Sequence, residues 1–186
     1  MKKPIFILAL FCATCVLFSS CEKDDPDEPN QEELITTVNY TLSPAGGGDA
    51  IVLTFTDLDG DGGNDAVIQG GTLAANTTYA GSIELLNESE SPAEDITAEI
   101  DEEREEHQFF FESTVSGLSI AYTDQDANGM PVGLANSIST GNAGSGNIKV
   151  TLRHEPVKDA VGVADGDISN ASGETDIEVT FPIDVL

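Results

Sequence analysis

The chain is poor in the residues on which several classes of protein depend. Among its 186 residues there is no tryptophan, and there are three tyrosines, three cysteines and seven basic residues against 34 acidic ones, giving a formal net charge of −27. A field of that sign repels nucleic acid and anionic membrane surfaces, and it concentrates cations. The basic, aromatic-rich surface of a nucleic-acid-binding protein is therefore absent. The scarcity of aromatic rings also argues against a sugar-binding cleft.

Motifs for catalysis are missing too. There is no G-x-S-x-G nucleophile elbow and no glycine loop placed to cradle phosphate, and only His107 and His154 are available as a base. A zinc site could be assembled from these histidines and a glutamate, but no H-x-x-x-H or cysteine pairing supports it. A hydrolase would need Glu103, His107 or His154 to converge in a cleft. The sequence alone also does not exclude a pair of carboxylates of the kind that glycosidases use. We expect a protein that is not an enzyme, with His107 on the surface and His154 partly buried beside a partner such as Glu155.

The N-terminus has the pattern of a secretory signal. Lys2 and Lys3 precede an apolar run of 15 residues, Pro4 to Phe18, which is too short to span a bilayer as a helix. The "FSSC" at residues 18–21 resembles the lipobox of bacterial lipoproteins, in which small residues precede a cysteine that is lipidated and becomes the new N-terminus. The sequence therefore predicts a lipoprotein signal peptide over residues 1–20 and a membrane anchor through lipid on Cys21. The alternative is an ordinary cleaved signal with Cys21 incidental.

An acidic segment, residues 22–33, follows this cysteine. Because it is low in apolar residues and high in charge, it cannot bury enough surface to order itself, and we expect a flexible tether. Its "KDD" at residues 23–25 resembles the surface-export signal of Bacteroidota lipoproteins, and a plain solvated tether is the alternative. Cys12 and Cys15 would leave with the signal, so the remaining domain, residues 34–186, is expected to be a single unit without a disulfide.

Alternation of apolar and polar residues dominates that domain. Ile177, Val179, Phe181, Ile183 and Val185 alternate with polar residues or proline, which predicts a strand with one buried face. About eight such segments are separated by glycine-rich turns: TTVNYTLS (36–43), AIVLTFTD (50–57), TYAGSIELL (78–86), HQFFFES (107–113), LSIAYTD (118–124), PVGLANSIST (131–140), NIKVTLRH (147–154) and TDIEVTFPIDVL (175–186). This pattern predicts an all-β fold, an antiparallel β-sandwich of Ig-like or jelly-roll-like type. Pro182 suggests that the last strand lies at an edge.

One short acidic helix interrupts the strands. In "SPAEDITAEIDEEREEH", Ser91 is the expected N-cap, Pro92 the first helical residue and Glu94 the partner that closes a capping box. The apolar stripe is thin, so we expect the helix to lie on a sheet edge or across the end of the sandwich.

Two aspartate-rich loops share the spacing D-x-D-x-[DN]-G. The first offers Asp57, Asp59, Asp61 and Asp65, and the second offers Asp124, Asp126 and Asn128. Alternate carboxylates in a tight turn are typical of calcium loops, although the glutamate that completes an EF-hand is missing from both. The alternative is that each aspartate hydrogen-bonds its own backbone in a hairpin turn. We expect weak, structural Ca²⁺ binding and no organic cofactor.

Three consecutive phenylalanines, Phe109, Phe110 and Phe111, must place rings on both faces of their strand. Either the strand is covered on both sides, for instance by the preceding helix, or the rings form an exposed apolar patch for a partner. These residues and His154 are the candidate contacts for a ligand or partner.

The segments "EDIT…EE…EHQFFF", "YTDQDANGMPVGL", "VTLRHEP" and "GETDIEVTF" together resemble small flavobacterial-type surface lipoproteins of Bacteroidota. That family has no established activity, so the resemblance implies location and size rather than mechanism. Its members are sometimes labelled type 1 periplasmic-binding-fold proteins, but that fold needs two α/β lobes, which the strand pattern does not supply.

The functional expectation is a lipid-anchored outer-membrane protein that faces the cell exterior, with the periplasmic face as the alternative. It would act as a non-enzymatic binding or envelope-assembly module for an envelope protein or a glycan, and not for nucleic acid. The alternative is a small-molecule or glycan binding accessory of an uptake system.

Overall fold

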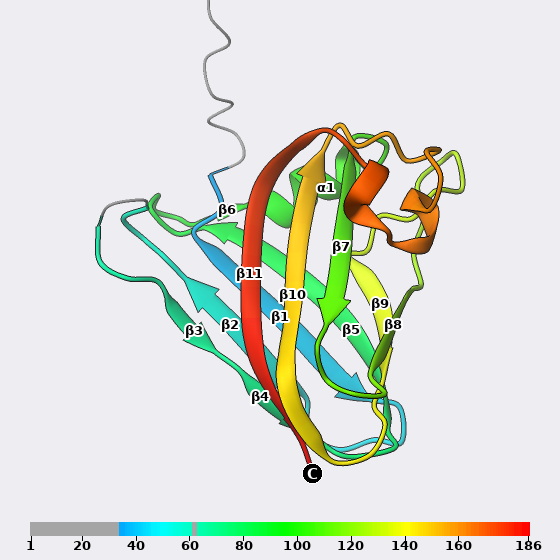
Figure 1. The fold of residues 1–186 in the computed structure, drawn as a ribbon. Coiled ribbons are helices and arrows are strands. Elements are labelled where there is room, and N and C mark those ends of the chain that lie inside the picture. The colour runs from blue at the N-terminus through cyan, green and yellow to red at the C-terminus, as the bar shows by residue number, and fades with distance from the viewer. Residues whose placement is uncertain (1–33, 61–62) are drawn as a thin grey trace, which may run out of the picture.

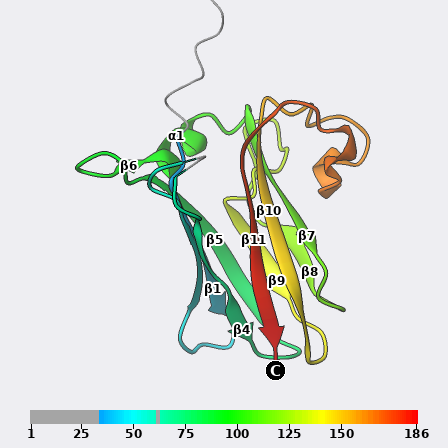
Figure 2. The same cartoon turned by 60° about the vertical axis from the view of Figure 1, so that its left-hand side comes forward.

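Two β-sheets packed face to face form the protein, as a computed structural model shows for residues 34–60 and 63–186 (Figures 1 and 2). The larger sheet has the order β3 (Val67–Gln69), β2 (Ile51–Thr56), β1 (Thr37–Pro44), β5 (Thr78–Asn87), β9 (Ala135–Ser139) and β8 (Ser119–Tyr122), with β6 (Glu94–Asp95) pairing β5. The smaller sheet has the order β4 (Gly71–Leu73), β11 (Glu174–Val185), β10 (Gly144–His154) and β7 (His107–Ser113). The predicted all-β sandwich is confirmed.

All eight strands that alternation predicts are present. The short strands β3, β4 and β6 are additional, and each is too short to show a period. The predicted signal peptide, the lipidated Cys21 and the tether lie outside the described residues. Within the described residues, no helix is long and apolar enough to cross a membrane.

The core lies between the sheets and follows the period of two. In β1, the side chains of Val38, Tyr40 and Leu42 are buried, and they face the partner sheet, to which β10 and β11 contribute Val150 and Phe181. Burying a side chain of this size stabilises the fold by about 1.5–3 kcal/mol. The buried Tyr40 hydroxyl donates to Asn136 Oδ1 at 2.6 Å, so its polar atom is satisfied inside the core.

A bend at Gly70 carries the chain from one sheet to the other. Before it, β3 pairs antiparallel with β2; after it, β4 pairs parallel with residues 183–185 of β11. A Cβ atom on Gly70 would lie 1.9 Å from the carbonyl oxygen of Pro182, so only glycine fits this corner. Along residues 177–181, the edge of β11 that faces away from β10 has no paired strand among the described residues. The prediction that the last strand lies at an edge is therefore correct for residues 177–181 and wrong for residues 183–185, which lie between β4 and β10.

The helix α1 (Ile96–Glu102) begins later than the expected cap. Ser91, Pro92 and Glu94 do not start it: the backbone of residues 94–95 pairs instead with the end of β5, and Glu94 accepts a bond from Asn87. The actual N-cap, Asp95, makes no side-chain cap bond. The capping-box prediction is wrong because the sheet takes up the backbone groups that a cap would have satisfied. The predicted position is correct, since α1 packs against β5 at one end of the sandwich (Figure 1).

Candidate functional site: an acidic groove and a histidine cluster

A groove of about 740 Å³ opens where β11 and the β2–β3 hairpin diverge from the Gly70 corner. Figures 1 and 2 show the sheets separating toward the end of the molecule that carries α1. Apolar side chains contribute to its wall, and its acidic lining residues are Asp57, Asp65, Asp176 and Glu178. None of the described lining residues is basic. Two of the four carboxylates have partners outside the groove, since Lys149 Nζ lies 3.4 Å from Glu178 and His107 Nε2 lies 4.0 Å from Asp176. The groove therefore combines apolar surface with negative charge.

The first aspartate loop has the hydrogen bonds of a tight turn. Asp57 Oδ1 accepts from the backbone N of Gly60 at 2.9 Å, and Asp59 accepts from the backbone N and side-chain amide of Asn64. The bonds from Asn64 hold the pKa of Asp59 below its ordinary value. Asp65 lines the groove, and Asp61 lies outside the described residues. At Asp57 and Asp59 the structure thus shows the turn-forming alternative, and calcium at this loop stays a prediction.

In the second loop, Asp124 organises the backbone rather than reaching outward. Its two carboxylate oxygens accept from the backbone N of Gly133 at 2.8 Å and of Ala135 at 3.0 Å. Gly133 has a φ of +97°, and a Cβ atom there would lie 2.8 Å from Phe109 Cβ. Asp124 therefore fixes the point at which the chain enters β9.

Asp126 is held by an internal cation. Its Oδ1 accepts from the backbone N of Asn128 and of Met130, both at 2.9 Å, and its Oδ2 lies 3.0 Å from Lys158 Nζ. The two side chains are 1% and 6% exposed, so the pair is shielded from solvent. A calcium ion on this carboxylate would have to displace the lysine ammonium group. Calcium is therefore not proposed for the second loop.

The three phenylalanines are not an exposed patch. Phe109 and Phe110 are buried on opposite faces of β7, and Phe111 is half-buried against Tyr40. The outer cover is the connection between β10 and β11, which contains η2 (Val163–Asp165) and η3 (Ile168–Asn170) and buries Phe110 against Val163 and Ala171. The exposed-patch prediction is wrong for Phe109 and Phe110, and the cover on both faces is confirmed, although α1 does not supply it.

The two histidines meet although they lie 47 positions apart in the sequence. They are directly paired across β7 and β10, and their rings stack with centroids 4.7 Å apart. His107 is fully buried, with Nδ1 3.1 Å from the carbonyl oxygen of Glu103 and Nε2 4.0 Å from Asp176 Oδ2. The expectation of a surface His107 is wrong because α1 ends at Glu102, and His107 begins β7, whose first four residues are buried. Neither histidine is among the described residues that line the acidic groove.

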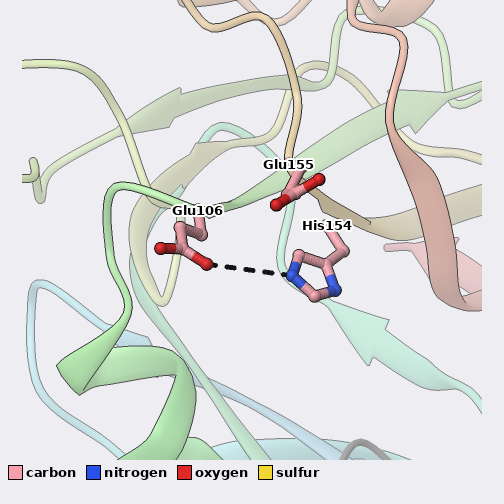
Figure 3. Close-up of side chains that lie close together, drawn as sticks. All are labelled: Glu106, His154 and Glu155. Atoms are coloured by element: carbon pink, nitrogen blue, oxygen red, sulfur yellow. Dashed lines mark ion pairs between the residues drawn. The ribbon is translucent and has the colours of Figure 1, made fainter. Parts of the chain in front are cut away.

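His154 is partly buried, as expected, and two glutamates converge on it (Figure 3). Its Nε2 lies 4.0 Å from Glu106 Oε2. One ligand atom from each of Glu106, His154 and Glu155 lies within 4.8 Å of the other two. The backbone N of Glu155 donates to the carbonyl oxygen of Glu106 at 2.6 Å, which ties the two glutamate backbones together.

Asp176 is a site residue that strand periodicity does not reveal. The register of β10 and β11 shifts between Leu152 and Arg153, and Asp176 has no opposite residue in the ladder. Such a bulge turns an additional side chain toward the inner face. The side chain of Asp176 is therefore 5% exposed and lies beside His107 at the wall of the groove. Alternation extrapolated back from Ile177 would place it on the outer, solvated face.

Comparison of the chain with known protein families, curated proteins and solved structures finds no match.

Proposed function

We propose that this protein is a lipoprotein anchored to the outer membrane by lipid on Cys21, facing the cell exterior, and that its sandwich is a non-enzymatic binding module. Support for the anchor comes from the charged start, the apolar run and the "FSSC" segment at residues 18–21. Support for the module comes from the fold: a closed core provides a rigid scaffold, and one end of it is open as a groove.

The ligand that fits this groove best is an extended, basic segment of an envelope protein. The observation that carries this assignment is the position of the groove beside two strand edges: its lining reaches Ala66, which directly precedes β3, and Ile177 and Glu178 in the unpaired part of β11. An extended peptide can pair its backbone with such an edge and place alternate side chains in the groove. Val67 and Ile68 on β3 are 68% and 43% exposed, which offers apolar contact. The carboxylates of Asp57 and Asp65 favour lysine or arginine in the peptide.

A binding measurement tests this assignment. The probe is a fluorescent eight-residue peptide that alternates lysine and valine, titrated with the full-length protein in detergent and followed by anisotropy. We expect binding that weakens with salt, and no binding of the peptide that alternates glutamate and valine. Asp57→Asn with Asp65→Asn should weaken binding roughly three- to thirtyfold, as the loss of two surface charge pairs of about 0.3–1 kcal/mol each predicts.

The matched control deletes the same number of negative charges at positions outside the groove. Asp49→Asn with Asp184→Asn also deletes two carboxylates, but neither residue lines the groove. Affinity should stay within the error of the measurement. Equal loss in both double variants would show that only net charge attracts the peptide, and equal binding of the basic and acidic peptides would contradict the assignment.

A further inference from the structure

Glu106, His154 and Glu155 form a small cluster of metal-ligating groups at the end of the smaller sheet (Figure 3). Their potential ligand atoms lie within 4.8 Å of one another. Ligands of a tetrahedral zinc ion, each about 2.0–2.2 Å from the metal, are about 3.3 Å apart. The cluster therefore needs to contract by about 1.5 Å at most, which rotation of the two exposed glutamate side chains can supply.

The least mobile of the three groups is the imidazole. His154 ends β10, where it is paired with His107 on one side and with Glu174 on the other. The fully buried ring of His107 stacks on it from behind. His107 itself is held by the carbonyl oxygen of Glu103 and by Asp176. A ring supported in this way presents its nitrogen with little loss of side-chain entropy when a ligand binds.

The two glutamates are placed by their backbones. Glu155 has a φ of +48°, an uncommon conformation for a residue other than glycine, and its N–H group bonds to the carbonyl oxygen of Glu106. Two chain segments 49 positions apart in the sequence thus bring both carboxylates to the same side of His154 (Figure 3).

We propose that Glu106, His154 and Glu155 bind one divalent transition-metal ion of the zinc class. One imidazole nitrogen with carboxylate oxygens is a ligand set for Zn²⁺, Co²⁺ or Mn²⁺, whereas Ca²⁺ requires six to eight oxygen ligands. Three protein ligands leave at least one coordination position for water or for a group from a partner. His107 is not a ligand, because its ring lies behind that of His154 and its two nitrogens face Glu103 and Asp176. This site does not depend on the proposed peptide-binding groove.

Isothermal titration with Zn²⁺ tests the site directly. The sample is the full-length protein in detergent, without a polyhistidine tag and after treatment with chelator. We expect one Zn²⁺ per chain, release by chelator, and weak or no competition from millimolar Ca²⁺. Glu106→Gln with Glu155→Gln should weaken binding about tenfold or more while the fold is retained, and His154→Gln should weaken it similarly.

The control is Glu102→Gln, which removes a nearby charge outside the cluster and should leave the affinity unchanged. A melting curve for each variant verifies that the protein is folded. The site would be overturned by the absence of stoichiometric binding at 100-fold excess of Zn²⁺, by equal affinity in the cluster variants and the control, or by preferential binding of Ca²⁺.

Discussion

Lys158 joins three separate segments of the chain through one ammonium group. Its Nζ atom donates to the carbonyl oxygen of Arg104, next to α1, and pairs with Asp126 in the second aspartate loop. Burial lowers the pKa of Lys158, and its bond to Asp126 opposes that effect. Burial also acts to raise the pKa of Asp126, but the bonds from Met130 and Lys158 outweigh it, so that pKa lies below its ordinary value. The ion pair therefore favours the carboxylate form of Asp126 and opposes the effect of burial on Lys158.

Asp126→Asn should destabilise the protein by about 3–5 kcal/mol, because it leaves the ammonium group of Lys158 buried without its counter-charge. Denaturant unfolding measures this cost. Lys158→Met removes the other partner, and the double variant Asp126→Asn/Lys158→Met should cost clearly less than the two single changes added together. If the costs add to within about 0.5 kcal/mol, the pair does not couple these segments.

Asp126→Asn should also change how the unfolding free energy depends on pH. A carboxyl whose pKa is lowered in the folded state contributes stability above its unfolded pKa of 3.8, and this contribution is lost as the pH falls through the folded value. The unfolding free energy of the wild type should therefore decrease as the pH is lowered below about 4. In Asp126→Asn this decline should be shallower, because asparagine does not titrate.

The aspartates could be found from the sequence, but their partners could not. The D-x-D-x-N-G spacing marks Asp124 and Asp126 as groups that satisfy donors in a turn, and it suggests a cation near them. The cation in the structure is Lys158, which lies 32 positions further along the chain in a segment without any motif. A local pattern cannot report a contact that arises only when α1, the loop and the β10–β11 connection are assembled.

At the scale of elements, long strands were predictable and the corner between the sheets was not. In β1, β5, β10 and β11, enough residues alternate to set the inner face. The strands β3 and β4 have three residues each and depend on tertiary pairing. The capping box failed for the same reason, since β5 pairs with the backbone that the expected helix would have used.

Gly70→Ala should destabilise the sandwich by about 2 kcal/mol or more, because its Cβ atom would clash with the carbonyl oxygen of Pro182. Gly46→Ala is the matched control, since a Cβ atom there meets nothing within 4 Å. Thermal or denaturant unfolding compares the two. Equal stability of the two variants would mean that β4 and β11 separate at little cost and that the corner does not define the groove.

At the scale of the whole molecule, both the negative net charge and the open groove support the proposed binding of a basic ligand. A chain with 34 acidic and seven basic residues carries a negative field that favours cations, and the groove lies at one end of its closed core. The groove and the stacked histidines, His107 and His154, lie at that same end. Asp176 lines the groove and lies beside His107. At this scale the sequence predicted the sandwich but not the groove, because the groove depends on the bend at Gly70 and the position of Asp176 depends on the bulge in β11.

Protease treatment of intact cells of the native host tests the central claim most directly, because a binding module for an external partner must be both anchored and exposed. We expect added protease to degrade the wild-type protein while a periplasmic marker stays intact, and we expect Cys21→Ser to lose its association with the membrane and its place on the cell surface. A wild-type protein that stays fully protected until the cells are broken would contradict the proposed outward-facing location.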